Sequence, residues 1–126
     1  MSTITNKEFL IANKTSKVIF ELSNILEVVP KKYYYQKNKT LGYAYELLET
    51  IHIVNNADYD ISREVQIIKK DITMLDFSLG FFVDKKCLSI KQTQRATYYL
   101  TEISKMTNVW FSNMKEKREK QIDIFG

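Results

Sequence analysis

Lysines interleaved with tyrosines form the part of this sequence that is best suited to bind a ligand. The chain has no acidic residue between Glu27 and Glu46, and none between Asp84 and Glu102. Cations neutralise phosphates, and aromatic rings stack on unpaired bases. The alternative is that the lysines only keep loop ends soluble while the tyrosines pack on neighbours. We predict that these two acid-free segments bind nucleic acid or a partner through Lys31, Lys32, Tyr34, Tyr35, Lys37, Lys39, Lys85, Lys86, Lys91 and Arg95.

The sequence has no arrangement of residues typical of an active site. It contains one histidine, His52, and one cysteine, Cys87. We interpret His52 as a partly buried structural residue and Cys87 as a small filler, although either could serve a small enzyme. Glu46 and Glu49 are not matched by a Glu-x-x-His pair elsewhere, so a di-iron bundle site is not supported. No phosphate-binding glycine loop is present. We therefore predict no catalytic residue, no metal site and no cofactor.

A second set of aromatic residues falls outside the predicted helix seams. In a monomer such rings would form an exposed apolar patch, and patches of this kind mark interfaces. The alternative is a thick core with wide helix faces. We favour self-association, and we predict a subunit interface formed by Tyr43, Tyr45, Phe77, Phe81, Tyr98 and Phe111.

The element expected to position these side chains is a long helix over about residues 60–86, opened by Asp58 or Asp60. Its charged residues, Asp71 among them, are expected on the face turned away from the core. Gly80 lies within the pattern, and we interpret it as a point of close helix packing. The apolar residues recur in steps of four and three, which places them on one face: Ile61, Val65, Ile68, Ile72, Leu75, Leu79 and Phe82.

Three further helices are predicted, over about residues 7–29, 41–56 and 90–117. Pro30 is expected to end the first, because the residue before a proline disfavours the helical region. Thr40 is the expected N-cap of the second helix, which leaves residues 31–39 as a linker. Ser89 is expected to start the fourth helix, and residues 118–126 are expected to form a charged tail.

Four amphipathic helices with short connections predict an all-α fold, an antiparallel up-down-up-down four-helix bundle formed as one domain by residues 1–126. The 126 residues are 44% hydrophobic, with only 3 Gly and 1 Pro to serve turns. No apolar run is long enough to span a membrane, and the single cysteine suits a cytoplasmic protein. In this topology the first and third connections lie at one end, so the two acid-free segments should meet there.

The sequence resembles a known family of four-helix bundles over most of residues 8–116. The family contains the accessory variability protein of diversity-generating retroelements and the bundle proteins encoded in intervening sequences of bacterial large-subunit ribosomal RNA genes. The likeness is carried by Met74-Leu75-Asp76-Phe77, Asp84-Lys85-Lys86, Leu88-Ser89, Lys91-Gln92, Leu100, Glu102-Ile103, Lys105-Met106 and Trp110, and by Pro30 and Thr40-Leu41-Gly42 at the entry to the second helix.

The resemblance implies an assembly and a function. In that family the bundle assembles into a five-subunit ring, and the retroelement member binds the reverse transcriptase and supports mutagenic copying of a template RNA into cDNA. It has no catalytic residues of its own. By this resemblance the chain is expected to form a cytoplasmic homopentamer that binds a reverse transcriptase and RNA or an RNA/DNA hybrid, without a membrane. The alternative is an oligomeric protein-interaction bundle of the intervening-sequence type with no nucleic-acid role.

Overall fold

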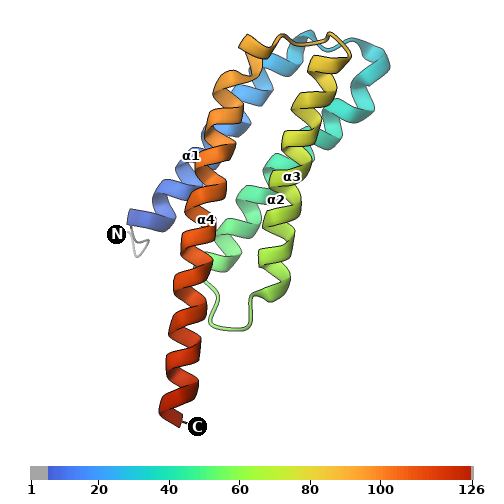
Figure 1. Cartoon of the computed structure of the whole chain (residues 1–126). Coiled ribbons are helices and arrows are strands. Elements are labelled where there is room, and N and C mark those ends of the chain that lie inside the picture. The colour runs from blue at the N-terminus through green and yellow to red at the C-terminus, as the bar shows by residue number, and fades with distance from the viewer. Residues whose placement is uncertain (1–5, 126) are drawn as a thin grey trace.

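The computed structural model describes the backbone of residues 6–125 and the side-chain environments of residues 10–116. Two short 3-10 turns, η1 (Leu26–Val28) and η2 (Lys31–Tyr33), connect the first two helices. The helices run alternately up and down, which confirms the predicted all-α antiparallel bundle (Figure 1). The four helices are α1 (Asn6–Ile25), α2 (Tyr34–Asn55), α3 (Ser62–Asp84) and α4 (Ile90–Phe125).

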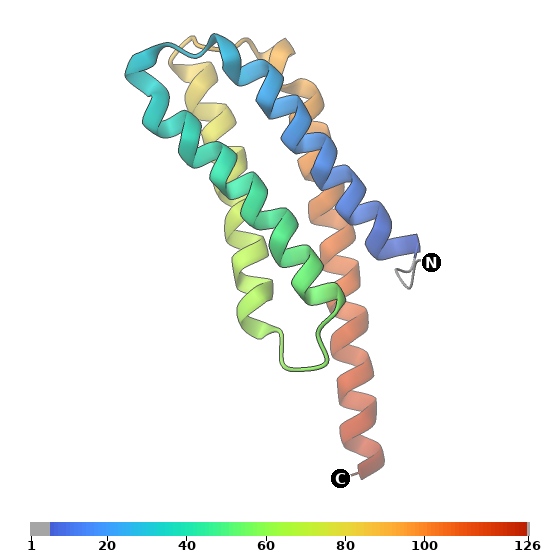
Figure 2. The same cartoon turned by 180° about the vertical axis from the view of Figure 1, so that it is seen from behind.

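Each helix packs against two neighbours. α1 contacts α2 and α4, and α3 also contacts α2 and α4. The α1–α2 and α3–α4 connections lie together at one end, whereas the α2–α3 connection lies at the opposite end (Figures 1 and 2). α4 continues past the α2–α3 connection (Figure 1). Over the part of the chain that the structure describes, no helix is both long enough and apolar enough to cross a membrane.

The core follows the predicted stripe on α3. Five of its seven residues are buried, and Val65 and Ile72 are partly buried against them. Leu22 of α1, Leu47 of α2 and Ile103 of α4 are fully buried in the same cluster. Burying one such side chain stabilises the fold by about 1.5–3 kcal/mol. The core is thus shared by all four helices.

Two helix starts are fixed by side-chain hydrogen bonds. The Ser89 hydroxyl accepts a hydrogen bond from the backbone N–H of Gln92 at 3.1 Å, and the backbone N–H of Ser89 donates to Gln92 Oε1 at 2.8 Å. This reciprocal pair is a capping box. At the start of α3, Asp60 Oδ1 accepts from the backbone N–H and the hydroxyl of Ser62 at 3.1 and 2.7 Å. The predicted start of α4 at Ser89 is confirmed. At α3 the N-cap residue is Ile61, and Asp60, one position earlier, bonds to the first residue of the helix.

α3 ends in a left-handed residue that is not glycine. Lys86 has a φ of 61°. Its N–H donates to the carbonyl of Val83 at 3.0 Å, and the N–H of Cys87 donates to the carbonyl of Phe82 at 2.8 Å. These two bonds form a Schellman motif, whose left-handed position usually holds glycine. A residue with a Cβ in that conformation costs about 1 kcal/mol.

The predicted start of the second helix is wrong. α2 begins at Tyr34, and residues 34–39 are helix rather than linker. Thr40 is buried inside the helix, and its hydroxyl donates to the carbonyl of Gln36 at 2.7 Å. A hydroxyl bonded to the preceding turn cannot serve as an N-cap.

Three smaller expectations are also corrected. α1 gives way to a 3-10 turn at Leu26, before Pro30 is reached. Residues 118–125 continue α4 instead of forming a separate tail. Gly80 is not a point of close packing, because a Cβ added there would meet nothing within 4 Å.

Candidate functional site

The bundle brings the two acid-free segments together at one end, as the topology predicts (Figure 1). Glu27 and Asp84 are exposed at the same end, and Glu21 lies 4.0 Å from Arg95, so the local excess falls from eight positive charges to five. Of the cations, Lys37 is half-buried and the others are exposed. They come from η2 (Lys31, Lys32), the start of α2 (Lys37, Lys39), the α3–α4 connection (Lys85, Lys86) and the start of α4 (Lys91, Arg95).

Several of these cations lie beside aromatic rings. The distances from the ammonium nitrogen to the ring centroid fall in the range of cation–π contacts. Because the α2 lysines sit on a helix and not on a linker, their spacing along the bundle is fixed. The contacts are Lys32 to Tyr33 at 5.2 Å, Lys37 to Tyr34 at 5.2 Å, Lys39 to Tyr43 at 5.5 Å and Lys85 to Phe81 at 5.9 Å.

A groove of about 340 Å³ runs between α2 and α3. The Tyr35 side chain is 71% exposed and that of Phe77 is 63% exposed. Phe81 is half-buried and packs edge-on against Tyr33 at 5.7 Å and Phe82 at 5.5 Å. We call this site the α2/α3 groove, and it is lined by Tyr35, Gln36, Lys39, Tyr43, Met74, Phe77, Ser78, Phe81 and Phe82.

The α2/α3 groove combines residues that the sequence pattern assigns to two separate sites. Tyr35 and Lys39 come from the predicted nucleic-acid set, whereas Tyr43, Phe77 and Phe81 come from the predicted subunit interface. These residues line one groove because α2 begins at Tyr34, so that Tyr35 and Lys39 stand on the helix. A linker over residues 31–39 would not hold these two side chains beside α3. The signal that could have revealed this was the absence of any helix breaker between residues 31 and 41.

The other predicted interface residues lie outside the groove. Tyr45 on α2 and Tyr98 on α4 are exposed. Phe111 is half-buried and stacks on Trp110 with ring centroids 5.5 Å apart. Phe20 on α1 is 70% exposed and was not predicted. The six predicted interface residues therefore do not line one common site.

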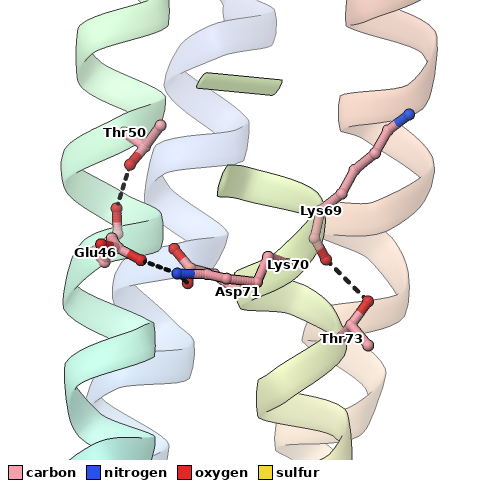
Figure 3. Close-up of polar contacts among 6 residues, drawn as sticks. All are labelled: Glu46, Thr50, Lys69, Lys70, Asp71 and Thr73. Atoms are coloured by element: carbon pink, nitrogen blue, oxygen red, sulfur yellow. Dashed lines mark hydrogen bonds and ion pairs between the residues drawn. The ribbon is translucent and has the colours of Figure 1, made fainter. Parts of the chain in front are cut away.

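A buried carboxylate lies in the cluster of Glu46, Lys70 and Asp71 between α2 and α3, which Figure 3 shows. Asp71 is fully buried on α3, contrary to its expected place on the exposed face. Lys70 Nζ lies 2.6 Å from Glu46 Oε1 on α2 and 3.1 Å from Asp71 Oδ1. The Lys70 ammonium is within ion-pair distance of Asp71, but the contact does not have the angles of a hydrogen bond. Neither carboxyl oxygen of Asp71 therefore has a hydrogen-bond partner. Lys70 also lies 5.5 Å from the Tyr43 ring centroid, which connects this cluster to the groove lining.

The environment of this cluster separates the proton affinities of its two carboxyls. Burial, with a contribution from the nearby Glu46, raises the pKa of Asp71 to about 7. The hydrogen bond from Lys70 lowers the pKa of Glu46. A protonated Asp71 can donate its O–H to the ionised Glu46, which supplies the partner that its oxygens otherwise lack. The cluster therefore retains a proton to higher pH than an exposed aspartate would.

The two residues considered for catalysis lie apart from this site. His52 is exposed, contrary to the expectation that it is partly buried. Cys87 is half-buried, and its Sγ lies 3.9 Å from the carbonyl of Lys85. Among the described residues, no group of three or more His, Cys, Asp and Glu side chains is placed to hold a metal ion.

Comparison with known proteins leaves the description at the level of fold. No protein-family model matches the chain, and no curated protein matches it. The architecture defines a four-helix all-α protein. Any assignment of function therefore depends on the α2/α3 groove and on the end of the bundle that carries Lys31, Lys32, Lys37, Lys39, Lys85, Lys86, Lys91 and Arg95, which we call the basic end.

Proposed function

We propose that this protein is a non-catalytic accessory bundle that binds RNA at its basic end and holds a reverse transcriptase on it. The proposal follows the resemblance to accessory variability proteins of diversity-generating retroelements. The observation that carries it is the convergence of eight cations from four segments at one end of the bundle. Clustered cations attract phosphates whatever the base sequence.

The backbone at Lys86 supports this use of the basic end. A left-handed lysine occupies a position where glycine would be more stable. Unfavourable backbone conformations are enriched at functional sites. The chain thus keeps a positive charge in the α3–α4 connection at a cost in stability.

Salt-dependent binding of RNA tests the basic end directly. We expect replacement of Lys31, Lys32, Lys85 and Lys91 by Glu to weaken RNA binding by at least about tenfold. The logarithmic salt slope should flatten by about 0.7 for each single-strand phosphate that the variant no longer neutralises. The matched control replaces four exposed cations away from this end, Arg63, Lys69, Lys105 and Lys115. Equal binding by both variants, or no salt-dependent binding by the parent, would refute the proposal.

The accessory role has a separate test in the gene neighbourhood. We expect a reverse-transcriptase gene and a variable repeat beside the gene for this protein, and the encoded enzyme should co-purify with it. RNA binding without such a neighbour would leave a basic RNA-binding bundle and remove the retroelement assignment.

A second candidate function is a protein-interaction bundle without a nucleic-acid role. The exposed Phe77 beside an apolar groove favours it, because such surfaces often bind protein. Both candidates include self-association, and the resemblance specifies a ring of five. Light scattering should then give a mass several times that of the 14.9 kDa chain. A monomer at micromolar concentration would contradict this part of the proposal.

A further inference from the structure

We propose that the α2/α3 groove binds unpaired bases of a single-stranded RNA whose phosphates contact the lysines at its rim. This inference rests on the proposed function and specifies its ligand as single-stranded rather than duplex RNA. It also assigns the bases to a surface distinct from the lysines of the connections.

The rings of the groove are placed to stack on bases. Tyr35 projects from α2 and Phe77 from α3, and both side chains are more than half exposed. Every base has a π face, and stacking on aromatic side chains is tolerant of sequence. In a duplex the bases are already stacked and paired, so only an unpaired segment can present them to these rings.

The charges around the groove fit a polyanion. Lys39 and Lys85 lie beside Tyr43 and Phe81, and neither is within 4.0 Å of a described carboxylate. The nearby Glu46 is neutralised by Lys70. The lining itself contains no acidic residue.

One hydrogen-bonding group favours bases over an acidic protein segment. Gln36 lines the groove, and its Oε1 is buried without a hydrogen-bond partner. A base that enters the groove can donate an N–H group to this oxygen, such as the N3–H of uracil. An ionised carboxylate only accepts hydrogen bonds, and an amphipathic helix uses its backbone N–H groups internally.

Binding of a short oligouridylate and of a blunt-ended RNA duplex of equal length tests the inference. We expect Tyr35→Ala and Phe77→Ala each to weaken oligouridylate binding by about 5- to 140-fold, since one stacked base contributes about 1–3 kcal/mol. The salt slope should stay unchanged because no cation is removed. Duplex affinity should change less than twofold. The controls are Tyr45→Ala on α2 and Phe20→Ala on α1, both exposed and outside the groove.

Each outcome separates this inference from the proposed function. Unchanged oligouridylate binding by Tyr35→Ala and Phe77→Ala, with weak binding by the lysine variant, refutes the groove and leaves the basic end. Equal losses for duplex and single strand refute the role of unpaired bases. If Phe77→Ala leaves RNA binding intact but lowers the mass in light scattering, the groove is a subunit interface and the inference is wrong. Thermal unfolding of each variant identifies any loss caused by misfolding.

Discussion

The α2–α3 seam and the α1–α4 seam use buried polar groups differently. Across the first, Lys70 and Asp71 of α3 meet Glu46 of α2. Across the second, Arg95 and Glu21 form an ion pair of 4.0 Å that is mostly exposed on the arginine side. The cluster around Asp71 therefore couples two helices beneath an exposed surface, and the α1–α4 seam has no comparable buried charge among the described residues.

The buried threonines on α1 and α4 sharpen the contrast. Thr15 donates to the carbonyl of Ile11 at 2.8 Å, and Thr107 donates to that of Ile103 at 2.9 Å. Each hydroxyl is satisfied within its own helix and adds no link to a neighbour. A polar cluster thus adds to the apolar packing of α2 against α3 beside the groove, whereas the buried contacts between α1 and α4 are apolar.

The largest expected effect on the free energy of unfolding comes from a buried apolar residue of the α1–α4 seam. Ile103 is fully buried on α4. We expect Ile103→Ala to lower the free energy of unfolding by about 2–5 kcal/mol, because the variant buries less apolar surface and leaves a cavity. Urea denaturation should give the same reduction at pH 5 and at pH 8, on either side of the Asp71 pKa of about 7. A reduction that depended on pH would show that the α1–α4 side is coupled to the buried carboxylate.

The next effect concerns Asp71 and pH. Its pKa in the folded state, about 7, exceeds its ordinary value of 3.8, so the folded state binds the proton more tightly. The resulting stability is fully present below about pH 4 and is lost as the pH rises through 7. We expect the parent to lose up to about 4 kcal/mol over this range, at about 1.4 kcal/mol for each pKa unit.

Asp71→Asn should remove most of this loss, measured as unfolding free energy against pH. The lowered pKa of Glu46 contributes with the opposite sign at more acidic pH and should remain. Asp76→Asn, at an exposed position on the same helix, is the matched control and should keep the parent profile. An Asp71→Asn profile that follows the parent would show that Asp71 does not titrate as its burial requires.

A smaller effect is expected at the end of α3. Lys86→Gly should raise the free energy of unfolding by about 1 kcal/mol, because glycine adopts a φ of 61° without a steric cost. The same variant should bind RNA more weakly if Lys86 contacts a phosphate. Lys86→Ala removes the charge and keeps the strained backbone, so its stability should stay close to that of the parent. If Lys86→Ala also raises the free energy of unfolding, then the lysine destabilises the fold through its charge and not through its backbone conformation.

The smallest effect is expected at the exposed pair of the α1–α4 seam. Glu21→Gln should change the free energy of unfolding by less than about 0.5 kcal/mol, since a 4.0 Å contact to a 70% exposed arginine is weak. Thermal unfolding at low and high salt measures it. A change above about 1 kcal/mol would remove the contrast between the two seams.

Much of the fold follows from apolar periodicity. The stripe from Ile61 to Phe82 predicts α3 and its buried face, because apolar residues that recur in steps of four and three fall on one face of a helix but not on one face of a strand. The start of α2 could not be predicted in the same way. Residues 31–39 are rich in lysine and tyrosine and have no apolar period, although nothing in them prevents a helix. Packing of the rest of α2 extends the helix back to Tyr34.

The candidate site was predictable in its charges but not in its shape. Bundle topology alone places Lys31 and Lys85 at one end. The groove requires Tyr35 of α2 and Phe77 of α3 to line the same surface, which depends on the rotation of each helix about its axis. The expected place of Asp71 was wrong for the same reason. Positions 71 and 72 both flank the core, and the charge of the aspartate was the only basis for expecting it on the exposed face. In the structure Asp71 is fully buried and Ile72 only partly so.

The order of the helices in the chain has a consequence for how the protein folds. α2 and α3 are joined by a short connection, whereas residues 26–89 separate α1 from α4. Contacts between distant segments require closure of a long loop, which costs entropy before any contact forms. We expect the α2–α3 hairpin to be ordered in the folding transition state, with higher φ-values for Leu47 and Leu75 than for Leu22 and Ile103. The half of the molecule that carries the groove would then form first, and α1 and α4 would dock onto it.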